Sequence, residues 1–259
     1  TLAGVVVLVA SQMGKKPEPE VAKEEPPPPP KKDSPKPKDN SPTDAEARKA
    51  IAALHPHAQL RFANGTLPWY GPSDPLPTEP LELTTITLGA LRPPDDITAL
   101  CLAAITSQKS FVSFQDYFQW CRWTEADFAK LAETPARESL TEFRTGLELT
   151  PKNVELMRKF PRITNLGLFA ENATDETVIG LVKHAPLVSA IIIRDLGKSE
   201  KVTGKGWAAV ASLPLRELEL IEPRGLDRAA CEAIGKMPDL IWFRIDRGNL
   251  DADGLKALA

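Results

Sequence analysis

The most regular feature of the sequence is a short apolar pattern that recurs through its last two thirds. Each copy consists of an apolar residue, two variable residues, an apolar residue, one variable residue and a third apolar residue. The copies begin at residues 83, 111, 140, 163, 188, 215 and 240, in steps of 23 to 29 residues. Those at 111 and 140 have Asp116 and Thr145 in the third apolar position. A period of this length predicts a stack of similar units.

A second pattern follows most copies and predicts a helix in each unit. It consists of a polar residue, apolar residues at helical spacing and a closing proline. Four such segments open at Thr150, Thr174, Thr203 and Asp227. Thr and Asp favour helix starts because their side-chain oxygens accept hydrogen bonds from free backbone N–H groups. Proline cannot continue a helix, so each unit is predicted to be a short strand followed by a helix of roughly ten residues.

Neither element buries its apolar side alone, so the units must stack, with parallel strands on the inner curve and helices on the outer curve. This arrangement resembles leucine-rich repeats of the ribonuclease-inhibitor-like class over residues 81–259. The resemblance implies an α/β fold, a leucine-rich-repeat solenoid that is truncated at its C-terminus. The loops after the strands lack the usual asparagine, so no asparagine ladder is expected. One buried row is expected to contain Leu88, Leu168, Ile193, Leu220 and Ile245.

Residues 45–80 do not fit the repeat and are predicted to form an N-terminal α/β cap that covers the open first unit. Asp44–Leu54 is typical of a helix, His57–Phe62 of a strand, and Asn64-Gly65 of a turn. His55 and His57 are two residues apart but have no third ligand nearby. They therefore favour a surface strand over a metal site.

Residues 14–44 are predicted to be a disordered linker rich in proline, lysine and glutamate. Ten prolines fall within residues 17–42, and seven lysines are balanced by seven acidic residues over residues 14–44. Polyproline II geometry makes such a segment a semi-rigid spacer. The alternative is a ligand for SH3- or WW-like modules, which bind proline-rich segments.

Residues 2–10 form an uninterrupted apolar run at the start of the sequence. Crossing a bilayer takes about 20 apolar residues. Residues 1–13 are therefore interpreted as the end of a truncated transmembrane helix. A secretory signal and a buried strand are the alternatives. Lys15 and Lys16 after the run do not settle its orientation, because the other flank is not seen.

The order of apolar segment, linker, cap and repeats resembles bacterial membrane-anchored leucine-rich-repeat proteins. In many of those proteins, a cytoplasmic Ser/Thr protein kinase precedes the transmembrane helix. The resemblance implies a sensor role on the periplasmic or extracellular side of the cell envelope. The 259 residues themselves contain no kinase motif.

Composition argues against several classes of function. The 32 basic and 35 acidic residues give a net charge of −3, without the basic excess typical of nucleic-acid-binding domains. Cys101, Cys121 and Cys231 are too few and too far apart for a disulfide framework or a thiolate zinc site, and are expected in the core. With only three histidines, no catalytic centre, metal or small-molecule cofactor is expected.

The variable positions at +2, +4 and +6 from each start are expected to face the inner curve, because side chains alternate along a strand. Trp, Tyr and Arg dominate protein-binding hot spots. The candidate binding residues are Tyr117, Glu142, Arg144, Phe169, Arg194, Glu217, Glu219, Trp242 and Arg244. The expected partner is a protein or peptide, with membrane contact only through the N-terminal segment. Two alternatives remain: ordinary strand residues that pair sideways, and a scaffold or self-associating solenoid without a dedicated ligand.

Overall fold

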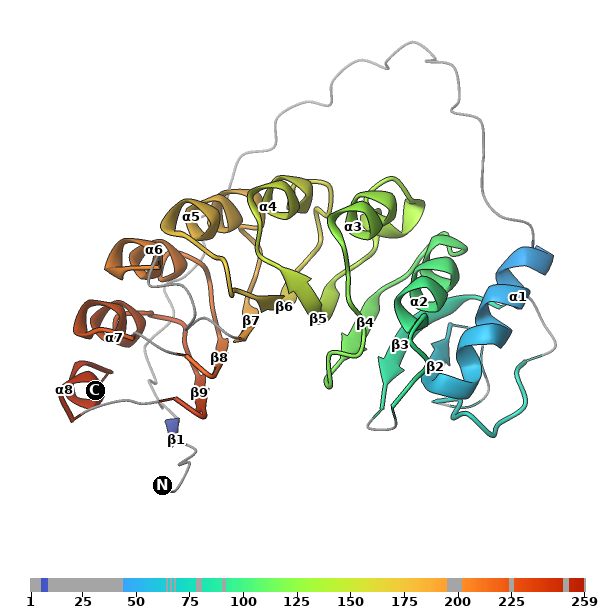
Figure 1. The fold of residues 1–259 in the computed structure, drawn as a ribbon, viewed down its shortest axis with the longest axis horizontal. Coiled ribbons are helices and arrows are strands. Elements are labelled where there is room, and N and C mark those ends of the chain that lie inside the picture. The colour runs from blue at the N-terminus through green and yellow to red at the C-terminus, as the bar shows by residue number, and fades with distance from the viewer. Residues whose placement is uncertain are drawn as a thin grey trace, which may run out of the picture.

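The computed structural model describes residues 6–8, 44–63, 65, 67, 69–77, 81–89, 92–194, 202–223, 226–248 and 252–258. Over these residues, strand–helix units follow one another along an arc, with strands inside and helices outside (Figure 1). The strands are β1 (Val6–Leu8), β2 (Ala58–Phe62), β3 (Leu83–Leu88), β4 (Ser113–Asp116), β5 (Glu142–Glu148), β6 (Asn165–Phe169), β7 (Ala190–Arg194), β8 (Glu217–Ile221) and β9 (Trp242–Asp246). The helices are α1 (Asp44–Leu54), α2 (Ile97–Thr106), α3 (Glu125–Leu131), α4 (Pro151–Met157), α5 (Asp175–His184), α6 (Gly204–Val210), α7 (Arg228–Gly235) and α8 (Ala252–Leu258).

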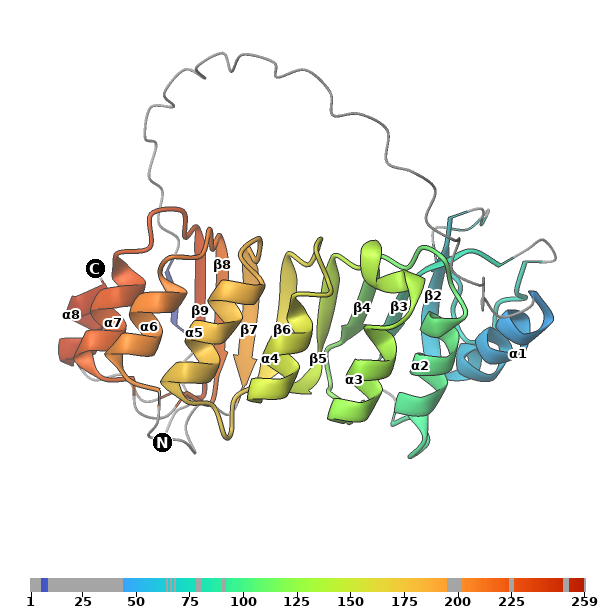
Figure 2. The same ribbon diagram turned by 90° about the horizontal axis from the view of Figure 1, so that it is seen from above.

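The nine strands form one sheet in the order β1-β9-β8-β7-β6-β5-β4-β3-β2. Strands β3 to β9 are parallel and lie in chain order, whereas β2 and β1 pair antiparallel at the two edges. Figure 2 shows the helices side by side in a row over one face of this sheet. The chain therefore has an α/β fold with a mostly parallel sheet, built by repeated alternation of strand and helix.

The buried row expected from the third apolar position is confirmed for four of its five residues. Strand pairing places Leu168, Ile193, Leu220 and Ile245 opposite one another, and all four are buried. Leu88 is buried as well, but its partner on β4 is Asp116. A continuous core therefore lies between the sheet and the helices.

The two irregular copies of the pattern are accommodated in different ways. In β5, a bulge between Arg144 and Leu147 lets Leu147, rather than Thr145, pair with Leu168 in the buried row. A bulge of this kind inserts extra residues into one strand and shifts the following side chains. The carboxylate of Asp116 instead accepts the N–H groups of Trp120 (3.0 Å) and Cys121 (2.8 Å). Burial raises the pKa of Asp116, against the opposing effect of these donors.

Aromatic side chains fill the core of the central units. The Phe143 ring lies 5.0 Å from Trp123, 5.6 Å from Phe114 and 5.6 Å from Phe128 between ring centroids. Phe128 in turn stacks on Phe160 at 4.9 Å. Rings bury a large apolar area and gain further from edge-to-face and offset contacts. This cluster joins β4, β5 and α3 into one packed body.

The three cysteines lie in the core, as expected, and are free thiols. The sulfur atoms of Cys101 and Cys121 are 3.9 Å apart. Burial, followed by the proximity of Cys121 and Asp116, raises the pKa of the Cys101 thiol well above its ordinary value. The thiol form is therefore favoured over the reactive thiolate.

The helix starts expected from the polar residues are confirmed. The side chains of Thr150, Thr174, Thr203 and Asp227 each accept a backbone N–H in the first turn of α4, α5, α6 and α7. Thr124 does the same for α3, in a reciprocal capping box with Asp127. These bonds satisfy donors that a helix start otherwise leaves free.

Side chains at the helix starts also join neighbouring units. Glu125 at the start of α3 accepts the Thr150 hydroxyl at 3.0 Å and pairs with Lys152 at 3.2 Å. Asp175 at the start of α5 accepts the N–H (2.8 Å) and hydroxyl (2.7 Å) of Thr203. Carboxylates therefore link α3 to α4 and α5 to α6 along one edge of the helix row.

The segment predicted to form the N-terminal cap contains the expected helix, α1, and the expected strand, β2. His55 and His57, however, lie in a 3-10 turn before that strand, and His55 is buried. The proposed surface strand therefore begins at Ala58 and contains neither histidine. In the described ranges, no group of three or more potential metal ligands is found.

The N-terminal apolar run differs from its expected form where it is described. Val6–Leu8 is a strand that pairs with β9 rather than a turn of helix. The other residues of the run, and all of the linker expected over residues 14–44 except Asp44, lie outside the described residues; Asp44 is the first residue of α1. Within the described part of the chain, no helix has both the length and the apolar character needed to cross a bilayer.

Candidate functional site

The side chains that face the inner curve form columns across the sheet. The +2 column pairs Thr85, Ser113, Glu142, Asn165, Ala190, Glu217 and Trp242 in one unbroken register. The +4 column likewise pairs Thr87, Gln115, Arg144, Gly167, Ile192, Glu219 and Arg244. The sequence-based assignment of these two columns is confirmed over all seven parallel strands.

The +6 column is correct only in part. Phe169, Arg194, Ile221 and Asp246 are in register, but Phe169 pairs with Glu148 on β5 and not with Gly146. The bulge in β5 causes this shift of two residues. Gly146 instead lies directly under the Phe169 ring: a Cβ atom at this position would come within 2.7 Å of the ring. A glycine at position 146 therefore allows the ring to pack onto the β5 backbone.

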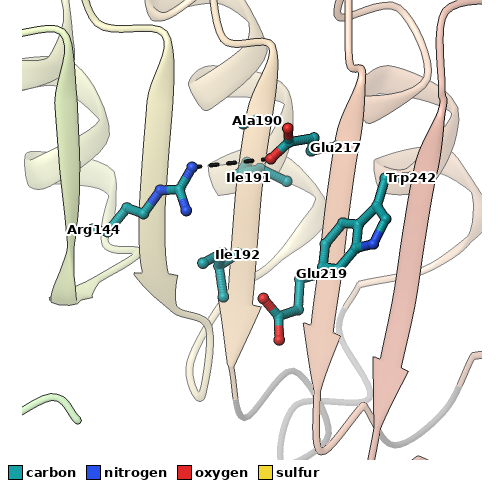
Figure 3. Close-up of a pocket in the computed structure, with 7 residues that line it drawn as sticks. All are labelled: Arg144, Ala190, Ile191, Ile192, Glu217, Glu219 and Trp242. Carbon is teal, nitrogen blue, oxygen red and sulfur yellow. Dashed lines mark ion pairs between the residues drawn. The ribbon is translucent and has the colours of Figure 1, made fainter. Parts of the chain in front are cut away.

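Residues from three strands surround a hollow of about 230 Å³ on the inner face. Arg144 comes from β5, Glu217 and Glu219 from β8, and Trp242 from β9, while Ile192 and its neighbours on β7 form the floor. Figure 3 shows the Trp242 indole reaching from β9 over β8, beside both glutamates. Arg144 points toward the same space from the opposite side. Four of the nine sequence-predicted residues thus meet at one place.

Ion pairs hold the charged residues around this hollow. The Arg144 Nε lies 2.8 Å from Glu142, whereas its terminal nitrogen lies 4.0 Å from Glu217. On the other side, Arg244 donates to Glu219 at 2.9 Å. The sideways pairing of Glu142 with Arg144, weighed as an alternative to ligand binding, is therefore present. It does not engage every carboxylate equally, because the Glu217 side chain is 51% exposed and Glu219 only 12%.

A polar network covers the neighbouring part of the inner face, over β4 and β5. The Gln115 amide donates to Glu142 at 2.6 Å, and Ser113 donates to the same carboxylate oxygen. The Tyr117 hydroxyl donates to Gln115 at 2.9 Å. Hydrogen bonds thus connect Tyr117 through Gln115 and Glu142 to Arg144, at the border of the hollow.

The remaining predicted residues gather at the carboxyl ends of the strands. An Arg194 terminal nitrogen donates to the backbone carbonyl of Tyr117 at 3.2 Å, although 77 positions separate them in sequence. Arg194 also lies two residues beyond Ile192 on β7, about 7 Å along the strand. Arg194 and Tyr117 at the strand ends are therefore adjacent to the hollow on the same surface.

The loop after β4 contributes two residues that the repeat pattern did not single out. Phe118 is 54% exposed and stacks on Trp120, with ring centroids 6.3 Å apart. The Trp120 indole N–H donates to the Gly89 carbonyl at 3.0 Å, which fixes the loop to the end of β3. Contiguous exposed apolar patches, rather than single exposed residues, mark interaction surfaces. The density of aromatic residues in 114–123 was the signal available in the sequence.

Side chains on this face are suited to binding. They offer hydrogen-bond donors, charges and aromatic rings. The clear pKa shifts of exposed carboxylates in the described residues, such as Glu125, Asp175 and Glu232, belong to the helices on the opposite side. No protein-family model matches this sequence, and no curated protein is significantly similar to it.

Proposed function

We propose that this chain is a leucine-rich-repeat solenoid whose inner face binds a protein or peptide ligand without catalysing a reaction. The observation on which the proposal rests is the hollow between β5 and β9. Its charged and aromatic side chains come from positions 144 to 242 and face one another only because the strands stack in register. Open inner surfaces are what stacked strand–helix units offer to partners.

The residue types support a protein ligand in particular. Trp242, Tyr117 and three arginines lie on the face, and these residue types dominate protein-binding hot spots. Phe118 extends the aromatic surface at its edge. Rings and guanidinium groups already held by neighbours lose less conformational freedom on binding than free side chains do.

Site-specific photocrosslinking in cells that make the protein tests this proposal. Benzoylphenylalanine replaces Ile192 on the inner face in one variant and the exposed Lys183 on α5 in the control. We expect a defined protein adduct from position 192 and none of that mass from position 183. The same adducts from both positions would contradict an inner-face site.

Affinity measurements on the identified partner complete the test. Truncation of a hot-spot residue costs about 2 kcal/mol or more, which is about a 30-fold loss of affinity. We expect a loss of that size for Trp242→Ala by calorimetry and unchanged affinity for Lys183→Ala. Equal affinities for the two variants would refute the role of the hollow.

Self-association is the second candidate function, and β1 on β9 is the observation that favours it. An apolar strand there covers what is otherwise a sheet edge, and open edges pair readily with other chains. Sedimentation velocity over a wide range of concentration separates the two candidates. A single monomeric species supports the ligand-binding module, whereas concentration-dependent oligomers of the full chain support the scaffold.

Membrane attachment through the apolar run at residues 2–10 is a separate part of the proposal. The run precedes a proline-rich segment with the composition of a spacer, which would hold the repeats away from a surface. Fractionation of cells that make the chain, with and without residues 2–10, tests it. We expect the full chain in the membrane fraction and the shortened chain outside it.

A further inference from the structure

The charges around the hollow are unequal. Two guanidinium groups, from Arg144 and Arg244, face four carboxylates. Arg144 is shared between Glu142 and Glu217, and Arg244 between Glu219 and Asp246. Arg247 pairs with both Glu222 and Asp246, so counting Arg247 and Glu222 as well still leaves two more carboxylates than guanidinium groups. Arg194, a further guanidinium of the face, donates to the Tyr117 carbonyl just beyond the end of β4.

Glu217 is the carboxylate with capacity for another partner. Among the described residues, its one ion pair is the long contact to Arg144, at 4.0 Å, and half of its side chain is exposed. Arg144 lies much closer to Glu142, at 2.8 Å. A cation placed between Glu217 and Glu219 would therefore gain attraction without displacing a short ion pair.

Trp242 adds an aromatic surface to the same space. Figure 3 shows its indole beside the Glu217 and Glu219 side chains, above β8. The face of an indole attracts cations, and guanidinium groups also stack on it as flat planes. Ligand pockets for drug-sized molecules span about 300–1,000 Å³. The hollow, at about 230 Å³, lies below this range and has room for one side chain.

We propose that this hollow holds the guanidinium group of an arginine side chain from the ligand protein. The guanidinium plane stacks on Trp242 and its N–H groups donate to Glu217 and Glu219. Arginine suits the site better than a compact ammonium group, because its planar fork matches carboxylates and aromatic faces together. This inference rests on the proposed ligand-binding function and adds the chemistry of the residue recognised.

Short peptides that differ only in charge test the inference on the full chain. The probes are acetyl-Gly-Arg-Gly-amide, its citrulline analogue, which is nearly isosteric but neutral, and its glutamate analogue. The indole N–H signal of Trp242 is followed by NMR and assigned with Trp242→Phe. We expect a saturable shift with the arginine probe, with a Kd on the order of millimolar, and no shift with the other two.

Two variants separate the site from general charge effects. Glu217→Gln should weaken binding of the arginine probe about fivefold, since one cation contact is lost while the shape is kept. Glu155→Gln on the outer helix α4 removes the same charge from an exposed position and should leave Kd unchanged. Equal weakening by both variants would show that the probe responds to net charge only, and would overturn the inference.

Other outcomes also decide it. An equal Trp242 shift with citrulline, a stronger one with glutamate, or none with arginine up to about 20 mM, well above the expected Kd, would overturn the arginine site. An adduct from position 192 would then still support the ligand-binding face. Conversely, arginine binding without any adduct would count against the protein ligand and not against the chemistry of the hollow.

Discussion

The contact between the starts of α5 and α6 gives a sharp prediction about stability. Asp175 accepts three hydrogen bonds from the next unit: the Thr203 N–H at 2.8 Å, the Thr203 hydroxyl at 2.7 Å and the Gly206 N–H at 3.0 Å. Gly206 lacks a Cβ where one would come within 2.6 Å of the carboxylate. The close approach of the two helix starts therefore depends on both residues.

The loss of stability expected on replacing Asp175 follows from the number of these hydrogen bonds and from their exposure to solvent. A hydrogen bond to a charged group contributes about 1.5–3 kcal/mol. Partial exposure of Asp175 reduces this to about 0.5–1 kcal/mol per bond. Asp175→Ala should therefore lower the free energy of unfolding by about 2 kcal/mol, which for a chain of this size is about 4–8 °C in Tm. Asp175→Asn retains an acceptor oxygen and should lose about 1 kcal/mol or less.

The effect must depend on pH in a defined direction. Desolvation raises the pKa of Asp175, but the hydrogen bonds from Thr203 and Gly206 and the charge of Lys205 outweigh it, so the pKa is lowered from 3.8. A lowered folded-state pKa means that the stabilisation is complete above the unfolded-state value of about 4. It is lost as pH falls through the lower folded-state value. The difference between wild type and Asp175→Ala should thus shrink below about pH 4.

Urea denaturation at pH 7 and pH 3, followed by circular dichroism, measures this difference. Asp239→Ala is the matched control, because Asp239 is an exposed carboxylate between α7 and β9. We expect the control to stay within about 0.5 kcal/mol of wild type at both values. The reasoning is refuted if Asp175→Ala matches the control at pH 7, or if its cost is the same at pH 3.

Two further predictions concern the core. Phe143→Ala removes a fully buried ring with three aromatic neighbours and should lower the free energy of unfolding by about 3–5 kcal/mol. Phe118→Ala, in the exposed loop, should change it by no more than about 0.5 kcal/mol. Similar urea midpoints for the two variants would contradict the packing described. The three buried cysteines should resist iodoacetamide at pH 8 in the native chain and react when guanidinium unfolds it, as mass spectrometry would record. Rapid alkylation of Cys101 in the native chain would show that the thiol is accessible.

Residue spacing alone predicted the regular part of the architecture. Leu166, Ile191, Leu218 and Phe243 recur at the same point of each unit, and they pair in register because each strand must bury the same side as its neighbour. The polar helix starts were equally readable, since a cap depends on residues only three positions apart. Local chemistry was sufficient in both cases.

The irregular units could not be predicted in this way. Thr145 occupies the expected apolar position. Whether Thr145 pairs with β6 or a bulge forms in β5 depends on which residue of β6 lies opposite. Leu168 requires an apolar partner, and the bulge supplies Leu147. Thr145 remains buried beside it, and its hydroxyl has no hydrogen-bond partner among the described atoms. Pairing between strands, rather than the pattern within one, decided this part of the fold.

The candidate site was only partly predictable for a related reason. The columns identified which side chains face inward, including Arg144, Glu217 and Trp242. Their grouping depends on side-chain length and direction, through which Arg144 reaches from β5 toward β8. Phe118 escaped the columns altogether because it belongs to a loop, where no repeat constrains the position.

The residues that hold the units together differ from those proposed to bind a ligand. Cohesion between units comes from the buried rows and from carboxylates at the helix starts, such as Glu125 and Asp175, on the outer side. On the inner face, partly exposed ion pairs such as that of Glu217 with Arg144 contribute only about 0–1 kcal/mol. Under the proposed function, substitutions at Glu217 should therefore change ligand affinity while leaving the fold intact. The inner-face residues are dispensable for folding, and the core behind them keeps their strands in register. Each side chain can therefore be altered singly, and the arginine site can be tested without unfolding the protein.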